Sequence, residues 1–278
     1  MKMKKKIAYL GPEGTFSEEA LVKFLGNDSN VEKVPLPTIL DVIKDVDKGL
    51  VDEGLVPMEN SIEGSVNISQ DILTFESVAK IVREITIPVR HHLIVKKGQK
   101  LKNIKRIISH PHATAQCRVY LYNNFSNVEI IAANSTAEAV KRILDMEDDS
   151  AAIGTETAAK IYNLFILERD IEDNKDNKTR FVFIGNYIPP KTGKDKTSIV
   201  CFLKEDKPGS LYNILKEFAE REINLTRLES RPAKKSLGDY VFMIDMEGHL
   251  HDDKIFKAIE ALRDKVYMVK ILGSYSIY

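Results

Sequence analysis

The alternation of short apolar runs with longer amphipathic segments constrains this chain more than any other feature. Apolar runs that predict strands occupy residues 7–10, 55–57, 92–95, 106–109, 128–132, 151–153 and 180–184. Apolar residues at helical spacing predict helices over residues 17–25, 38–49, 113–125, 135–146 and 155–162. Strands and helices that alternate in this way are typical of a layered α/β fold. The chain crosses between two such groups near Pro88 and again near Arg169, which predicts two lobes around a cleft.

A change of composition separates these groups from the last part of the chain. Residues 189–195 combine two prolines with polar residues and contain no apolar residue, so they predict a linker. The pattern then becomes strand 197–203, helix 210–221, strands 225–230 and 240–246, helix 252–263 and strand 266–274. This βαββαβ order predicts a ferredoxin-like domain over residues 196–278.

Charge and cysteine content narrow the classes of protein. The 41 basic residues balance the 41 acidic ones, so no global field favours nucleic acid or an anionic membrane as a partner. The two cysteines form no CxxC pair, which favours neither a zinc site nor a disulfide framework. No apolar run approaches the roughly 20 residues that span a bilayer, and Gly11, Pro12 and Glu13 interrupt any signal peptide. We therefore expect a cytoplasmic protein.

Hydroxyl and amide side chains follow most of the predicted strands. They are Thr15, Asn60, Ser61, Thr114, Ser135, Thr136 and Thr155. The carboxyl ends of strands in an open α/β sheet line the ligand crevice, and helix N-termini there attract anions. These residue types are also the ordinary helix N-caps. From the pattern, a carboxylate-binding cleft and simple capping are about equally favoured.

Motifs for cofactors are missing from the sequence. The glycines of residues 11–14 have neither the spacing of a dinucleotide site nor that of a P-loop. No cluster of residues has metal-ligand spacing, and we expect His91, His92, His249 and His251 to be structural or exposed. The sequence predicts no cofactor and no metal.

Four segments together resemble the prephenate dehydratase family. They are Gly11-Pro12-Glu13-Gly14-Thr15-Phe16-Ser17, residues 57–66 (PMENSIEGSV), residues 109–117 (SHPHATAQC) and Thr179-Arg180-Phe181. They occur in the family's order across the whole first part of the chain, which makes the combination specific.

The resemblance implies a catalytic domain over residues 1–188, with two lobes like those of type 2 periplasmic binding proteins. Lobe one would span about 1–87 and 170–188, and lobe two about 88–169. The family removes carbon dioxide and the ring hydroxyl of prephenate together, which leaves phenylpyruvate. Catalytic residues by resemblance are Thr179, Arg180 and Phe181. Expected substrate-binding residues are Thr15, Asn60, Ser61, Gly64, Ala113, Thr114, Gln116, Ser135 and Thr136.

Individual roles follow from chemistry within this resemblance. Thr179 is a poor acid at neutral pH, so we expect it to hydrogen-bond the leaving hydroxyl. Arg180 is expected either to form a structural ion pair or to bind a carboxylate, and Phe181 to supply an apolar wall.

The last domain is similar to an ACT domain, a regulatory ferredoxin-like module. Pro208-Gly209-Ser210-Leu211 stands where the family usually has Pro-Gly-Ala-Leu, and Glu229-Ser230-Arg231-Pro232 matches its second effector motif. By resemblance the effector is L-phenylalanine, bound between paired copies in a homodimer or homotetramer. The expected contacts are Gly209, Ser210, Leu211, Asn224, Leu225, Glu229 and Ser230. No helical segment precedes Ile7, so we expect a monofunctional enzyme without a chorismate mutase domain.

Other functions stay open on the sequence alone. An arogenate dehydratase performs the same elimination on a substrate that bears an amino group. A non-catalytic sensor of amino acids or anions is a second alternative, because both domains resemble ligand-binding modules. A nucleic-acid-binding regulator is disfavoured by the zero net charge.

Overall fold

The computed structural model describes residues 4–26, 28–205, 207–234 and 239–277. Its contacts divide the chain into two compact units. The first unit holds residues 1–42, 55–66 and 86–181, and the second holds residues 43–54, 67–85 and 182–278. These units do not follow the sequence-based domain bounds, which stay a prediction. None of the described helices has the length and apolar character needed to cross a bilayer.

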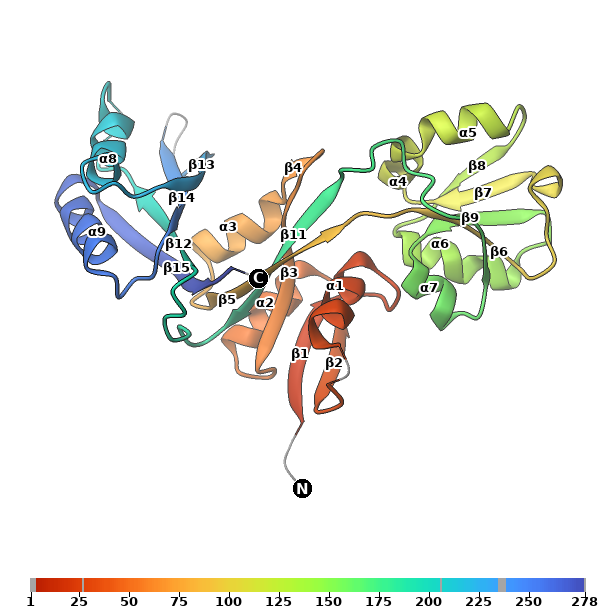
Figure 1. The fold of residues 1–278 in the computed structure, drawn as a ribbon, viewed down its shortest axis with the longest axis horizontal. Helices are drawn as coiled ribbons and strands as arrows, with labels where there is room; N and C mark the ends of the chain where they lie inside the picture. The colour runs from red at the N-terminus through yellow and green to blue at the C-terminus, as the bar shows by residue number, and fades with distance from the viewer. Residues whose placement is uncertain (1–3, 27, 206, 235–238, 278) are drawn as a thin grey trace. The chain divides into compact units, whose positions relative to one another are not determined.

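The N-terminal elements of the chain form a parallel sheet with helices beside it. They are β1 (Lys5–Leu10), α1 (Phe16–Leu25), β2 (Val31–Leu36), α2 (Ile39–Asp47), β3 (Glu53–Asn60) and β4 (Gly64–Ser65). In the sheet, β1 lies between β2 and β3 (Figure 1). The short strand β4 folds back on β3 and pairs Gly64 with Asn60. This hairpin places Ser61 in a turn directly after the carboxyl end of β3.

A separate five-stranded sheet forms the other part of the first unit. Its strands, in spatial order, are β10 (Phe165–Glu168), β6 (His92–Val95), β9 (Ser150–Gly154), β7 (Arg106–Ser109) and β8 (Glu129–Ala132). The flanking helices are α4 (Pro111–Gln116), α5 (Arg118–Asn124), α6 (Thr136–Arg142) and α7 (Glu156–Ile161), with 3-10 turns η1 (Leu101–Asn103) and η2 (Ile143–Asp145).

The central strands β6, β9 and β7 are buried on both faces, which explains why they are continuous apolar runs, while the edge strands β8 and β10 are partly exposed. Leu93 and Ile107 pack into the core that α4 and α5 cover. Their chain neighbours Ile94 and Ile108 pack into the core that α6 and α7 cover. The α/β class expected from the sequence is confirmed.

Two expected helices are shorter than their apolar periodicity indicates. The helix predicted over 113–125 is two helices that meet at Cys117, where the backbone leaves the helical region (φ −112°, ψ 17°). The reason is a cap from elsewhere in the chain, because the Asp173 carboxylate accepts hydrogen bonds from Val119 N and Tyr120 N. Those N–H groups would bond to carbonyls of the preceding turn in a continuous helix. The helix predicted over 135–146 likewise ends early and continues as η2.

The second unit contains the expected βαββαβ module. Its elements are β12 (Asp195–Phe202), α8 (Ser210–Ala219), β13 (Leu225–Pro232), β14 (Tyr240–Glu247), α9 (Asp253–Lys265) and β15 (Met268–Ser276). The strand order is β13-β14-β12-β15, and α8 and α9 cover one face with a shared apolar core. β15 also pairs in parallel with β5 (Lys80–Pro88), which is followed in the strand order by β11 (Lys178–Gly185).

The opposite face of this module is covered by a helix that the sequence analysis did not predict. This helix is α3 (Asn67–Phe75). Its Thr74 hydroxyl lies 3.9 Å from the Met243 sulfur of β14, and the Phe75 ring makes an edge contact with Phe202 of β12. The Lys270 ammonium donates to three carbonyls at the end of α3, those of residues 73, 74 and 77. A lysine at a helix C-terminus satisfies carbonyls that have no partner inside the helix.

The segment expected to be a linker is an ordered turn. The Asp195 carboxylate accepts hydrogen bonds from Thr192 N and Gly193 N, at 2.9 and 2.8 Å. Lys191 forms an ion pair with Asp252, and the His249 ring bonds the Pro189 carbonyl at 3.1 Å. Because Asp195 already belongs to β12, the turn is packed against the module that it introduces.

Glu19 provides a test of how α1 packs in the first unit. Burial, with the Glu156 carboxylate nearby, raises the pKa of Glu19 to about 7 from its ordinary value of 4.5. Between these values the folded protein holds a proton that the unfolded chain has lost, so stability falls as pH rises from 4.5 to 7. We expect Glu19→Gln to raise the free energy of unfolding by about 1–2 kcal/mol at pH 8 and to leave it unchanged at pH 4.5. Urea unfolding at both pH values measures this, with exposed Glu129→Gln as the control. An equal gain at both pH values would contradict it.

Candidate active site

A cluster of amide and hydroxyl side chains lies where β3 ends beside the start of β11. The Asn60 amide nitrogen donates to the Thr179 hydroxyl oxygen at 2.9 Å and approaches the Lys178 carbonyl at 3.3 Å. The Asn60 amide oxygen accepts from the backbone N–H groups of Ile62 and Glu63, at 2.9 and 3.0 Å. Both ends of the Asn60 side chain are therefore used within the protein. Because Asn60 donates to Thr179, the Thr179 proton is available for another acceptor.

Asn177 joins this pair to the turn after β3. Its amide oxygen accepts from Asn60 Nδ2 at 2.9 Å and from the Ser61 hydroxyl at 3.3 Å. The Ser61 oxygen in turn accepts from the backbone N–H of Lys178 at 3.0 Å. Asn177 is only 1% exposed, so its hydrogen bonds are shielded from water.

The second part of the cluster comes from α4 and from the start of β6. Asn177 Nδ2 donates to Gln116 Oε1 at 3.1 Å, and His91 Nε2 lies 3.0 Å from the same oxygen. The Phe16 ring packs edge-on against the His91 ring, with centroids 5.4 Å apart. The cluster thus gathers residues from four segments of the chain.

A cavity of about 320 Å³ opens beside this cluster. Its lining residues are Ile62, Glu63, Ala115, Gln116, Glu172, Asp173, Asn174 and Asn177. Two of its carboxylates are engaged, since Glu172 accepts from His91 N and pairs with Arg90, and Asp173 caps α5. The Gln116 amide nitrogen is 3.5 Å from Glu63 Oε1, at the mouth of this space.

His91 belongs to the cluster, although the sequence analysis gave it no site role. Burial lowers the pKa of His91, so the ring is neutral at physiological pH. His92 accepts from Asp170 N and His249 bonds Pro189, so both are structural, and His251 is exposed, as expected. The sequence pattern cannot distinguish His91 from His92, because adjacent side chains of an extended segment lie on opposite sides. Only the folded structure shows which of the two rings faces the cluster.

Several expected binding residues serve as helix caps. The Thr15 hydroxyl donates to the Leu10 carbonyl and accepts from Glu18 N. Ser135 accepts from Glu138 N, and Thr155 accepts from Ala158 N while it donates to the Gly14 carbonyl at 2.7 Å. Of the two interpretations that the pattern left open, capping accounts for these three hydroxyls. Thr136 is nearly buried in the first turn of α6.

The remaining expected residues are spread around the cluster. Arg180 forms an ion pair with Glu59 of β3 (3.4 Å), and Phe181 is buried in the interior at 2% exposure. Ala113 packs in the core under α4, and Gly64 is exposed in the β4 turn with φ +81°. The ion pair favours the structural role for Arg180.

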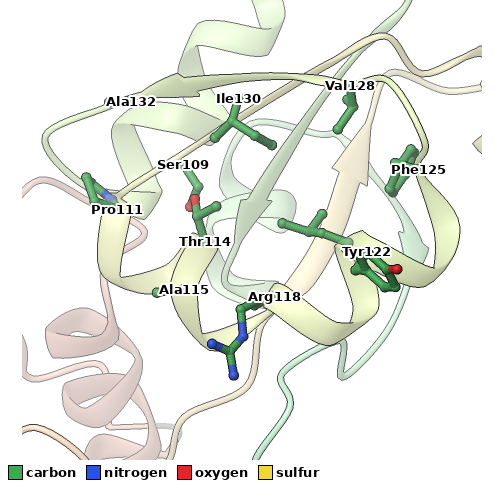
Figure 2. Close-up of a pocket in the computed structure, with 11 residues that line it drawn as sticks. Ser109, Pro111, Thr114, Ala115, Arg118, Tyr122, Phe125, Val128, Ile130 and Ala132 are labelled. Carbon is green, nitrogen blue, oxygen red and sulfur yellow. The ribbon is translucent and has the colours of Figure 1, made fainter.

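A larger groove, of about 500 Å³, lies on the other side of α4 (Figure 2). It is lined mainly by apolar side chains between α4, α5 and the strands β7 and β8, including Tyr122, Phe125 and Ile130. Figure 2 shows the Arg118 guanidinium pointing away from these apolar side chains. Thr114, an expected binding residue, lines this groove rather than the smaller cavity. An apolar groove of this kind does not suit a ligand with two carboxylates, so the smaller polar cavity is the better candidate.

The expected effector residues lie at two places in the βαββαβ module. Gly209 is the N-cap of α8 with φ +90°, and open space surrounds the position of an added Cβ. Ser210 begins α8, while Leu211 and Leu225 pack against the module's core. The others are on or next to the edge strand β13: Asn224 and Ser230 are exposed, and Glu229 forms ion pairs with Arg227 and Arg231.

In residues 4–26, 28–205, 207–234 and 239–277, no three His, Cys, Asp or Glu side chains are arranged to hold a metal ion.

An α/β unit with a polar, hydrogen-bonded cavity, followed by a ferredoxin-like module, defines a small-molecule enzyme or binding protein with an added regulatory domain. Comparison with known proteins identifies which one. The family model described as prephenate dehydratase matches residues 7–188, and the ACT domain model matches residues 197–264. The chain belongs to the prephenate dehydratase family.

Individual relatives agree with this assignment. The chain is 45% identical over 280 residues to a prephenate dehydratase of Methanocaldococcus jannaschii, with 99% of this chain and 100% of that protein covered. A solved prephenate dehydratase of Arthrobacter aurescens, in complex with L-Phe, has a TM-score of 0.90 and 36% identity, covering 98% of this chain and 90% of that one. A structure described as GqqA, a novel type of quorum quenching acylase, has a TM-score of 0.89 and 28% identity, covering 99% and 98%. The sequence-based expectation of the family and of the ACT domain is confirmed.

Proposed function

We propose that this protein converts prephenate to phenylpyruvate, water and carbon dioxide, and that L-phenylalanine inhibits it through the ACT domain. The observation that supports the catalytic part most directly is the hydrogen bond from Asn60 to Thr179. It leaves the Thr179 hydroxyl as a donor in the same cluster as Gln116 and Asn177, which line the polar cavity.

The elimination most needs a hydrogen-bond donor beside the departing hydroxyl group. When the ring carboxylate leaves as carbon dioxide, its bonding electrons enter the ring, and the hydroxyl at the opposite carbon departs. The ring becomes aromatic, which drives the reaction. The departing oxygen gains negative charge and needs a proton or a strong hydrogen bond. Thr179 supplies the hydrogen bond, and the departing hydroxide takes up one proton from the buffered solution to become water.

The other residues of the cluster bind and orient the substrate in this proposal. One N–H of the Gln116 amide lies toward Glu63 Oε1 at 3.5 Å, and the other is offered to a substrate oxygen, while Ile62 and Glu63 of the turn after β3 shape the cavity. Arg180 holds Glu59 and thereby the relation of β11 to β3. Thr15, Ser135 and Thr136 act through the helix starts that they form, and Phe181 acts through packing.

Phenylalanine binding is assigned to the Gly209 turn and β13. The relative from Arthrobacter aurescens is described in complex with L-Phe, which supports this effector for the present chain. β13 ends the strand order of the module, and an edge strand can pair with another copy. We include a homodimer or homotetramer formed through ACT domains in the proposal. A cytoplasmic location is also included, because both cysteines are free thiols.

Incubation of the purified protein with prephenate at neutral pH, with and without phenylalanine, tests this function. We expect phenylpyruvate to form without an added cofactor and phenylalanine to suppress its formation. Parallel reactions with arogenate test for arogenate dehydratase activity, and reactions with an N-acyl amide test for the acylase activity by which the GqqA structure is described. A higher kcat/KM for arogenate than for prephenate would make arogenate the substrate. Binding without turnover of any of the three would indicate a sensor.

Gly209→Val should remove inhibition while leaving the uninhibited rate within about twofold. The branched side chain fills the open space beside the turn, where the effector would lie, and we expect the phenylalanine concentration for half-inhibition to rise at least tenfold, about 1.4 kcal/mol. Gly193→Val is the matched control, because Gly193 also has a positive φ (+94°) and open space around an added Cβ. Unchanged inhibition in Gly209→Val, or equal loss in both variants, would place the effector elsewhere.

A further inference from the structure

The amide groups of the candidate site form one chain of hydrogen bonds whose direction can be worked out from the backbone. The chain runs from Thr179 through Asn60, Asn177 and Gln116 to His91. The oxygen and nitrogen of an amide side chain look alike in shape, so the direction of such a chain must follow from its neighbours. Backbone N–H groups, which can only donate, provide the fixed points here.

The first fixed point is at Asn60. Two backbone N–H groups, of Ile62 and Glu63, point at the same end of its amide, so that end is the oxygen. The other end is then the NH2 group, which donates to Asn177 and Thr179. The atom of Asn177 that faces Asn60 must therefore be its oxygen.

The contacts of Ser61 agree with this direction. The backbone N–H of Lys178 donates to the Ser61 oxygen, which leaves the Ser61 proton free to point at Asn177. An oxygen at that end of Asn177, which the first fixed point requires, accepts this proton. Its NH2 group consequently faces Gln116, whose facing atom must be the acceptor Oε1.

The chain of hydrogen bonds ends at His91, where its direction fixes the position of the ring proton. Because Gln116 Oε1 is an acceptor, His91 Nε2 must carry a hydrogen. The His91 ring is 2% exposed, and its Nδ1 atom makes no hydrogen bond. Such a ring is best accommodated as the neutral form with its proton on Nε2, since an N–H on Nδ1 would be buried without an acceptor. Two donors, from Asn177 and His91, then hold the same oxygen of Gln116.

We propose that Asn177 and His91 are positioning residues that hold Gln116 with its NH2 group toward the cavity, so that it donates to an anionic oxygen of the substrate. The proposal rests on the proposed function for the identity of the substrate. The direction of the hydrogen bonds does not depend on it. Without these two donors, Gln116 could present either its oxygen or its nitrogen, and an oxygen would repel a carboxylate.

The direct test is the protonation form of His91 in the wild-type protein. We expect ¹⁵N NMR to show one neutral form of His91, with the proton on Nε2, assigned by its loss in His91→Gln. A proton on Nδ1 alone would require Gln116 to present its NH2 group to His91 and would overturn the proposal. This measurement needs no substrate, so it separates the positioning role from the proposed activity.

Asn177→Asp tests the consequence for the substrate. The new carboxylate keeps an acceptor for Asn60 and Ser61 but cannot donate to Gln116. Gln116 should turn over, donate to the carboxylate and face the cavity with its oxygen. We expect kcat/KM for prephenate to fall about 10- to 100-fold, as for the loss of one hydrogen bond to a charged group. The Nε2-protonated neutral form of His91 should be lost at the same time.

Asn123→Asp is the control for added charge. Asn123 is exposed on α5 and does not line the cavity, so an aspartate there adds the same charge outside the candidate site. We expect less than about a threefold change in kcat/KM and an unchanged His91 spectrum. An equal loss of activity in both variants would mean that charge alone acts, and the positioning role would be wrong. A fall in activity for Asn177→Asp with His91 unchanged would also overturn it.

Discussion

Thr179→Val should lower kcat for prephenate by about 10²–10³-fold, the usual cost of removing one donor aimed at developing charge. Valine keeps the branched shape of threonine and removes only the hydroxyl. Asn60 donates to the Thr179 oxygen, which leaves the Thr179 proton available for the substrate. The initial rate of phenylpyruvate formation measures the effect.

Two further variants sharpen the interpretation. Thr179→Ser retains the hydroxyl and should recover most of the rate. Thr86→Val changes an exposed threonine on β5 and should leave kcat within about twofold. Wild-type kcat in Thr179→Val would remove Thr179 from the chemical step and would leave the proposed mechanism without its donor.

Gly14→Ala should lower the free energy of unfolding by about 2–4 kcal/mol, through two separate costs. Gly14 has φ +87°, a conformation that L side chains rarely adopt. An added Cβ would also lie 2.8 Å from the Ala158 Cβ and 3.0 Å from its Cα. Ala158 is buried in α7, and the neighbouring Thr155 hydroxyl bonds the Gly14 carbonyl, so the turn has little room to move away.

Urea unfolding of the wild type and of Gly14→Ala measures this loss. Gly98→Ala separates the two costs, because Gly98 has a similar positive φ (+92°) and nothing within 4 Å of an added Cβ. We expect it to cost only about 1–2 kcal/mol. Equal losses in the two variants would show that contact with Ala158 contributes nothing. We also expect Gly14→Ala to lower activity, since Phe16 at the start of α1 packs against the His91 ring of the cluster.

The motif that opens the chain illustrates what a sequence pattern can and cannot reveal. Residues 11–17 form one of the four segments that resemble the family, but from their pattern an anion site and a helix cap were equally favoured. The structure shows that Thr15 caps α1, and that Gly14 is required by a close approach of Ala158, 144 positions further along the chain (158 minus 14). A close approach of two distant segments leaves no periodic signal in either of them.

The broken helix at Cys117 and the helix α3 illustrate the same limit. The apolar residues of 113–125 fit one helix, and only the Asp173 carboxylate, which caps a new helix start, divides it. The sequence pattern did not predict α3 because this helix is stabilised by contacts with a distant part of the chain. It packs against β12 and β14, and Lys270 of β15 donates to its terminal carbonyls. Its polar positions, including Ser69 and Gln70, are buried, which weakens the amphipathic pattern.

By itself the sequence determined the α/β class, the βαββαβ module and the family, because strands and helices follow from the spacing of apolar residues within short segments. It also named Asn60, Gln116 and Thr179 as site residues by resemblance. Only the tertiary structure decided that Asn177 and His91 join them, and to which partners each amide donates. The hydrogen bonds of Asn60 to Asn177 and Thr179 connect positions 117 and 119 residues apart. The nearby backbone N–H groups of Ile62 and Glu63 set the direction at Asn60, but its partners Asn177 and Thr179 are reached only when β3 and β11 lie together, so no local pattern could contain these bonds.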